Sequence, residues 1–152
     1  MKKLIIMTAL FVLGILLMLS ACEAGKGQNV GDKMLQMKIG DTVVAVRWED
    51  AAAVHALKEL CANAPLTIRM SMYGGFEQVG PVGRNLPRDD RQITTVPGDI
   101  VLYSGNRIVV FYGSNSWSYT KLGHISDKSN AELAKLLGNG DITLTLSMDN
   151  SR

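Results

Sequence analysis

The chain is poor in the residues that mark several classes of protein. Its 152 residues include two Cys, four Pro and two His, with two Trp, four Tyr and three Phe. Two cysteines exclude a disulfide-rich scaffold, and two histidines without a Cys cluster argue against a zinc module. The sequence also lacks a glycine-rich phosphate loop and a recognised catalytic motif. We therefore expect no metal and no cofactor.

The chain also has only a small excess of charge of one sign. The formal net charge is +2, from 16 basic and 14 acidic residues. Lys2 and Lys3 supply the excess, so a chain processed after residue 21 would hold 14 of each sign. A neutral domain lacks the electrostatic footprint of a nucleic-acid binder, and we expect no nucleic-acid partner.

The N-terminus has the pattern of a secretory signal. Lys2 and Lys3 precede residues 4–19, which contain no charged residue, and the sequence Leu-Ser-Ala-Cys over residues 19–22 resembles the lipobox of bacterial lipoproteins. This pattern predicts a signal peptide over residues 1–21, lipidation at Cys22 and a flexible tether over residues 22–33. An uncleaved anchor helix is the alternative. Both readings place the rest of the chain in the bacterial cell envelope, outside the cytoplasm and attached to a membrane.

Residues 34–148 are predicted to form one mainly β domain. Apolar residues alternate with polar ones over 35–39, 43–48, 66–73 and 142–148, and a turn at Gly40-Asp41 joins the first two of these strands. Residues 100–103 and 107–112 form a second hairpin that is apolar on both faces. Short strands are expected over 93–96 and 122–125, and long loops over 80–92 and 113–118.

Two short helices complete the predicted domain. One follows Asp50 as its N-cap and carries an apolar stripe over residues 53–61. The other begins with a capping box at Ser129 and Glu132 and ends at Gly138. About eight short strands favour a closed barrel, because closure removes exposed strand edges. The two helices would cap its ends.

Four stretches resemble the bacterial cyclophilin-like domain family. They are residues 65–67, 72–77, 97–103 and 108–125, and the resemblance extends over roughly residues 34–148. It implies an eight-stranded cyclophilin-like β-barrel. Prolyl isomerases of this fold carry an F-x-x-x-x-R pattern on one strand. Here Arg69 is a strand arginine but position 64 is Ala, so no catalytic residue is carried over. A peptidyl-prolyl isomerase with a degenerate active site remains the alternative to a binding module.

The predicted ligand-binding residues are four aromatic residues beside loops and one glutamate. Aromatic side chains combine apolar area with a polar group, which suits a peptide or small-molecule ligand. Trp117 has two open readings, as a plug of the barrel end or as a ligand contact. The predicted site lies at the barrel mouth and consists of Tyr73, Glu77, Tyr112, Trp117 and Tyr119.

Other chemically capable residues are assigned structural roles. Cys61 lies on an apolar helix stripe and is expected to be buried and inert. Asp89 and Asp90, between Arg88 and Arg91, are expected to form a self-neutralised loop. His124 lacks an evident carboxylate partner in the sequence.

Overall fold

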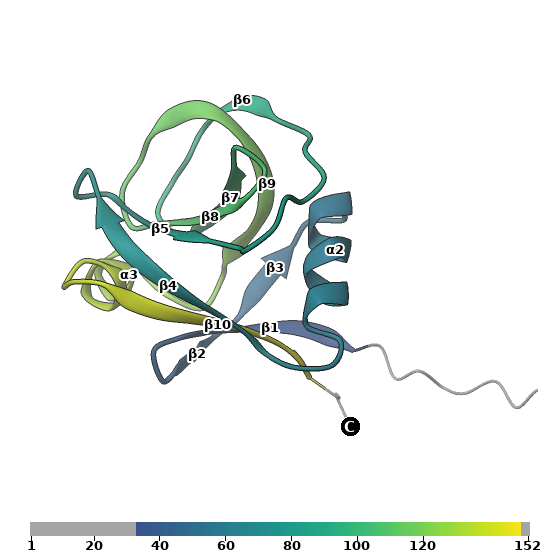
Figure 1. Cartoon of the computed structure of the whole chain (residues 1–152). Helices are drawn as coiled ribbons and strands as arrows, with labels where there is room; N and C mark the ends of the chain where they lie inside the picture. The colour runs from purple at the N-terminus through teal and green to yellow at the C-terminus, as the bar shows by residue number, and fades with distance from the viewer. Residues whose placement is uncertain (1–32, 150–152) are drawn as a thin grey trace, which may run out of the picture. The chain divides into compact units, whose positions relative to one another are not determined.

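The computed structural model describes residues 33–149, which form an antiparallel β-barrel with two helices (Figure 1). Among these residues no helix is both long and apolar enough to cross a membrane. The predicted signal peptide, Cys22 and all of the tether except Lys33 lie outside the described residues. The strands are β1 (Met34–Ile39), β2 (Thr42–Val44), β3 (Val46–Trp48), β4 (Leu66–Tyr73), β5 (Glu77–Pro81), β6 (Arg91–Thr94), β7 (Asp99–Tyr103), β8 (Arg107–Phe111), β9 (Ser116–Ile125) and β10 (Ile142–Asp149), and the helices are α2 (Ala52–Leu60) and α3 (Asn130–Leu137).

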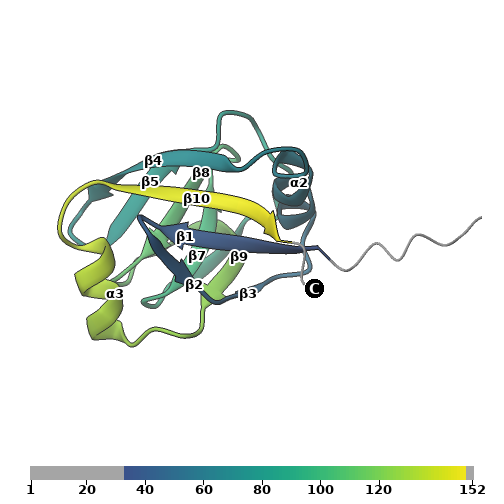
Figure 2. The same ribbon diagram turned by 90° about the horizontal axis from the view of Figure 1, so that it is seen from below.

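The sheet comes close to closing on itself. Nine strands follow one another in the order β2-β1-β10-β4-β5-β8-β7-β9-β3, and β6 pairs with β9 outside this path. The strands at the two ends of this order, β2 and β3, are separated in the chain only by Ala45. The carbonyl oxygen of Ala45 accepts a hydrogen bond of 2.8 Å from the amide of Ser126, just after β9. The predicted barrel is confirmed, and α2 and α3 lie at its opposite ends (Figure 2).

Two separate apolar clusters lie on the two faces of the hairpin formed by β7 and β8. Ile100 and Leu102 belong to the main core with the side chains of most other strands and of both helices. Val101 and Val109 belong to a second cluster with Phe111 and Tyr119. Because successive strand residues point to opposite faces, the main core fills the barrel and the second cluster lies on its outer wall. This explains why the hairpin is apolar on both faces.

The first hairpin forms as predicted, but its second strand breaks early. β1 pairs with β2, and Gly40 at the turn has a φ of 57°. After Ala45 the chain leaves β1, and β3 pairs with β9 instead. The predicted helix cap at Asp50 is wrong, because the helix begins one residue later with Ala51 as N-cap. The carboxylate of Asp50 instead contacts the ring of His55, with Oδ1 and Nε2 2.8 Å apart.

Two predicted loops are partly strands. β5 begins at Glu77 and β9 begins at Ser116, so ten residues of β9 replace the four expected. In β5, a Cβ on Gly80 would lie 2.5 Å from the sulfur of Met70, so glycine here reflects close packing and not a turn. In β9, residues 116–119 pair with β6.

The second helix begins as predicted. The Ser129 hydroxyl accepts a hydrogen bond from the Glu132 amide, and the Glu132 carboxylate accepts one from the Ser129 amide, which completes the capping box. Gly138 ends the helix with a φ of −99°, so it does not adopt the left-handed conformation expected of it.

Candidate functional site

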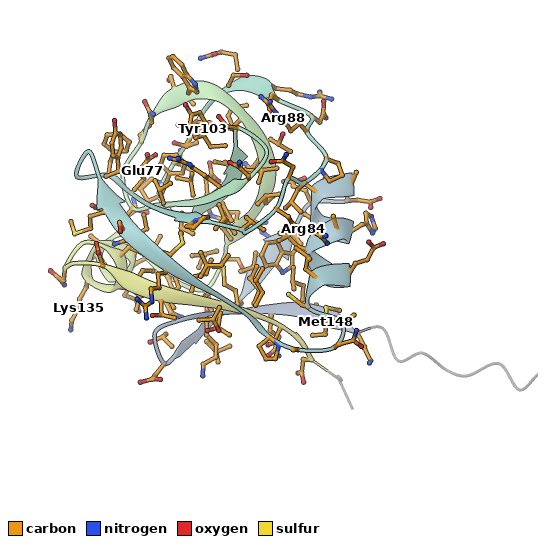
Figure 3. All side chains as sticks on the ribbon, in the orientation of Figure 1. Glu77, Arg84, Arg88, Tyr103, Lys135 and Met148 are labelled. Atoms are coloured by element: carbon orange, nitrogen blue, oxygen red, sulfur yellow. The ribbon has the colours of Figure 1, made fainter. Side chains whose placement is uncertain are left out.

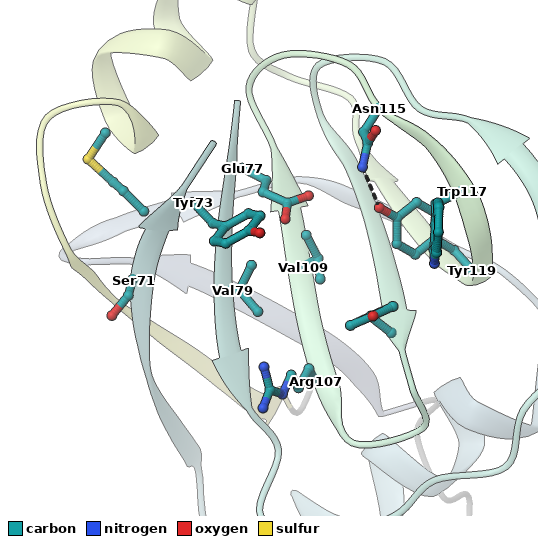
Figure 4. Close-up of a pocket in the computed structure, with 11 residues that line it drawn as sticks. Ser71, Tyr73, Glu77, Val79, Arg107, Val109, Asn115, Trp117 and Tyr119 are labelled. Carbon is teal, nitrogen blue, oxygen red and sulfur yellow. Dashed lines mark hydrogen bonds between the residues drawn. The ribbon is translucent and has the colours of Figure 1, made fainter. Parts of the chain in front are cut away.

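A pocket of about 510 Å³ opens on the outer wall of the barrel (Figure 4). Its residues come from β4, β5, β7, β8, β9 and the segment before β9. Val79, Tyr103, Val109 and Tyr119 also belong to, or pack against, the outer apolar cluster. The lining residues are Ser71, Met72, Tyr73, Glu77, Val79, Tyr103, Arg107, Val109, Asn115, Trp117 and Tyr119.

Four of the five residues predicted to bind a ligand line this one pocket. They are Tyr73, Glu77, Trp117 and Tyr119. The fifth, Tyr112, is partly buried against the main core. The pocket also differs in place from the prediction, since it lies on the outer wall and not at the barrel mouth. Figure 3 shows its residues Glu77 and Tyr103 across the barrel from Met148 of β10.

A tight hairpin positions Tyr73 and Glu77. The two residues face one another at the ends of β4 and β5, joined by Gly74, Gly75 and Phe76. Gly74 has a φ of 62°, and a Cβ there would lie 2.3 Å from the ring of Phe76. Only glycine fits both requirements. The Phe76 ring therefore lies close over the turn.

Phe76 fastens this hairpin to the rest of the wall. Its ring stacks on that of Phe111 with the ring centroids 6.5 Å apart. Its carbonyl oxygen accepts hydrogen bonds of 2.9 Å from the amides of Tyr112 and Gly113. A Cβ on Gly113 would lie 2.7 Å from the Cβ of Phe76, so this approach also needs a glycine. The aromatic residue between the two candidate ligand residues thus holds them in place.

Glu77 is a buried acid without a hydrogen-bond partner for one oxygen. The residue is only 7% exposed, and its Oε2 has no partner within the described part of the chain. Burial disfavours the charged form and raises the pKa of Glu77 to about 7. Glu77 therefore exists in both protonation states near neutral pH.

Tyr119 lies at the base of the pocket. Its hydroxyl oxygen accepts a hydrogen bond of 2.9 Å from the side-chain amide of Asn115. Its ring packs edge-on against Phe111 and Tyr103, with centroid distances of 5.7 Å and 6.1 Å. Burial, and after it the negative charge of Glu77, raise the pKa of the Tyr119 phenol. Tyr119 therefore supports the wall with its ring and brings its hydroxyl to the pocket.

Trp117 and Tyr73 project into solvent at the pocket. Trp117 is 56% exposed and Tyr73 is 66% exposed. The reading of Trp117 as a plug of the barrel end is therefore wrong. Trp117 lies within β9, opposite Ile93 of β6, and not in the loop predicted for it. An exposed indole on the part of β9 that pairs with β6 leaves its apolar face available to a ligand.

Arg107 lies at the other end of the pocket from Glu77 (Figure 4). In the pairing of β5 with β8, Glu77 faces Phe111, Val79 faces Val109, and Pro81 faces Arg107. The valine pair thus forms an apolar floor between an acidic and a basic end. Sequence reasoning missed Arg107, Tyr103 and Asn115. Strand alternation across the second hairpin was the available signal, since it puts Tyr103, Arg107 and Val109 on one face.

His124 does have a carboxylate partner, from β7. The Nδ1 atom of His124 lies 2.8 Å from Oδ1 of the buried Asp99. The other oxygen of Asp99 accepts a hydrogen bond of 3.0 Å from the amide of Val96. These contacts hold the turn before β7, and neither His124 nor Asp99 lines the pocket.

The burial expected of the cysteine and the charge pairing expected of the loop over residues 88–91 are both confirmed. Asp90 pairs with Arg88, and Asp89 pairs with Arg91 at 3.0 Å. Asp90 also accepts a hydrogen bond of 2.6 Å from the Thr120 hydroxyl, which ties the loop to β9. Cys61 is buried, and burial raises the pKa of its thiol. Within residues 33–149 no group of three or more His, Cys, Asp or Glu side chains could hold a metal ion.

The nearly closed barrel with a helix at each end defines a cyclophilin-like domain. A sequence model of the cyclophilin-like family matches residues 37–147. The chain therefore belongs to the cyclophilin-like family, as its resemblance indicated. No curated protein matches the chain.

Proposed function

We propose that this protein is a lipid-anchored, extracytoplasmic cyclophilin-like module that binds a peptide segment or small molecule in the outer-wall pocket. The observation that carries the proposal is the pocket itself, in which the buried carboxyl group of Glu77 lies with the exposed rings of Tyr73 and Trp117. A concave site with aromatic walls and few polar groups is the common form of a ligand pocket.

The anchor is supported by the sequence Leu-Ser-Ala-Cys at residues 19–22 after an uncharged apolar run. The strand order places β1, where the tether joins the domain, across the barrel from β7 and β8. The pocket wall is therefore on the side of the barrel away from β1, the first strand after the predicted tether. This arrangement suits a module that meets its ligand in solution while attached to a membrane.

Fluorescence of Trp117 tests the binding proposal. The chain has two tryptophans, so Trp48→Phe leaves Trp117 as the single indole reporter. We expect members of a library of short peptides and small molecules to change its emission in a saturable way. Trp117→Ala should remove binding in a label-free assay, and Val96→Ala, at an exposed apolar residue outside the pocket, should not. A library without any saturable ligand would contradict the proposal.

Prolyl isomerisation is the second candidate function, because Arg107 could act as a hydrogen-bond donor in the pocket. Isomerisation faces a barrier of about 18–20 kcal/mol, and catalysis needs a donor aimed at the prolyl amide. Arg107 lines the pocket, whereas the strand arginine Arg69 does not. We expect no acceleration above background in a protease-coupled assay on X-Pro peptides. Rapid turnover that is lost in Arg107→Ala but kept in Arg69→Ala would favour the isomerase.

A further inference from the structure

We propose that the outer-wall pocket recognises a positively charged amine, held between the carboxyl group of Glu77 and the surrounding aromatic rings. This inference rests on the proposed ligand-binding function and assigns a charge to the ligand. The amine would belong either to a lysine side chain of a peptide or to a free small amine. The chemistry of recognition is the same for both.

The first support is the incomplete environment of Glu77. The residue is more than nine-tenths buried and lines the pocket, yet its Oε2 has no hydrogen-bond partner within residues 33–149. A buried carboxylate is costly unless a cation or hydrogen-bond donors accompany it. No basic side chain of the described residues forms a salt bridge with Glu77. Oε2 is itself shielded from solvent, so a cation in the pocket would approach the carboxyl group from the side that lines the pocket and would offset its negative charge.

The second support is the aromatic character of the walls. Four of the 11 lining residues are aromatic, namely Tyr73, Tyr103, Trp117 and Tyr119. The faces of aromatic rings attract cations, and desolvation strengthens this attraction. Tyr73 faces Glu77 directly across the hairpin, so its ring and the carboxyl group start from paired backbone positions. A carboxylate next to aromatic rings suits a cation better than an anion or an uncharged polar group.

The third support is the separation of Arg107 from Glu77. Arg107 pairs with Pro81, which is four residues after Glu77 on β5. Four residues correspond to about 13 Å at the usual rise of a β-strand. Val79 and Val109 lie between the two charged residues. The positive charge of Arg107 therefore does not fill the acidic end. The valine floor suits the apolar stem of an alkylammonium group, which packs its methylenes on apolar surface.

The protonation of Glu77 predicts the direction in which ligand affinity should change with pH. A cation favours the ionised carboxylate, whereas a ligand carbonyl would need the protonated acid as a donor. With a pKa of about 7, the ionised fraction of Glu77 rises about tenfold from pH 6 to pH 8. Glu77 is the only carboxyl group among the lining residues, and the other ionisable ones are Arg107 from β8 and tyrosines from β4, β7 and β9.

Matched probes on the full-length protein test the inference by calorimetry or ligand-observed NMR. The peptide arm compares a short blocked peptide containing a central lysine among alanines with the same peptide containing norleucine. The small-molecule arm compares n-butylamine with 1-butanol. We expect one or both cationic probes to bind more tightly than their neutral counterparts. Their affinity should rise about tenfold from pH 6 to pH 8.

Two variants complete the test. Glu77→Gln should abolish both the preference for the cation and the rise with pH, while Glu59→Gln makes the same charge change at an exposed site on α2 and should alter neither. Equal binding of neutral probes, or an affinity that falls as the pH rises, would overturn the inference and leave the binding function intact. So would pocket ligands from the library that contain no amine. Absence of any ligand from that library would instead contradict the binding function itself.

Discussion

The indole nitrogen of Trp48 donates a hydrogen bond of 2.7 Å to the carbonyl oxygen of Leu35. This contact links β3 to β1, near the two ends of the strand order. The ring of Trp48 packs against the main core, whereas Trp117, the other tryptophan, is 56% exposed. The two residues of the same type therefore have different roles, one in closing the barrel and one at the pocket.

Replacing each tryptophan by alanine should separate these roles. We expect Trp48→Ala to lower the free energy of unfolding by about 3 kcal/mol, because it removes a packed aromatic ring and leaves the Leu35 carbonyl without its donor. Trp117→Ala should change it by less than about 0.5 kcal/mol, as is usual for an exposed side chain. Chemical denaturation of both variants measures the difference. An equally large loss for Trp117→Ala would mean that its indole is structural.

The burial of Glu77 predicts a stability that depends on pH. Its pKa is raised to about 7 in the folded state from an ordinary value near 4.5. The folded state therefore binds more protons than the unfolded state between these values, and stability falls as the pH rises through this range. Glu77→Gln removes the ionisation and should raise the free energy of unfolding at pH 8 by about 3 kcal/mol, with little change near pH 4.

Urea denaturation of the native protein and Glu77→Gln at both pH values gives this comparison. Glu59→Gln serves as the control for a lost surface charge. A variant that is less stable than the native protein at pH 8 would show that the carboxylate is well accommodated. The raised pKa of Glu77 would then be wrong.

Gly80 should not tolerate even one added methyl group. A Cβ there would lie 2.5 Å from the sulfur of Met70, 2.6 Å from a methyl carbon of Ile68 and 2.7 Å from the Arg69 carbonyl oxygen. Gly80→Ala should therefore cost about 1–3 kcal/mol through overpacking of β5 against β4. Thermal unfolding monitored by circular dichroism measures the loss. Arg69→Ala, at an exposed side chain on the same strand pair, is the control and should have a small effect.

Cys22 determines the predicted attachment to a membrane. Cys22→Ser should prevent lipidation and leave a precursor that retains residues 1–21, because the serine hydroxyl does not replace the thiol as lipid acceptor. Mass spectrometry of the protein from a bacterial host distinguishes the processed lipoprotein from the precursor. Recovery of a diacyl-modified Cys22→Ser protein would contradict the lipoprotein assignment.

Local periodicity was sufficient to predict most of the barrel. The alternation over residues 66–73 and 142–148 and the capping box at Ser129 correspond to β4, β10 and the start of α3. The sequence did not predict strands in segments whose glycine and proline content is typical of loops but which pack as strands in the barrel. β5 contains a glycine and a proline that read as a loop, yet Gly80 lies against Met70 inside the barrel.

The pocket was only partly predictable because it combines strands distant in sequence. Aromatic residues near glycines pointed to Tyr73 and Trp117, and an acid after a strand break pointed to Glu77. The apolar residues on both faces of the β7–β8 hairpin indicated that both faces are covered, but not which segment covers the second face, since this depends on how β9 crosses it. Tyr112 shares the local pattern of the others, but its ring turns to the main core.

The first and last strands of the barrel are direct neighbours. β1 pairs with β10, and Met34 at the start of one lies opposite Asp149 at the end of the other. Joining these two residues by a short linker would add one surface loop and would leave every strand pair in place. The barrel is thus circular in its connectivity, and a permuted chain that begins at the exposed turn after β1 should fold to the same structure.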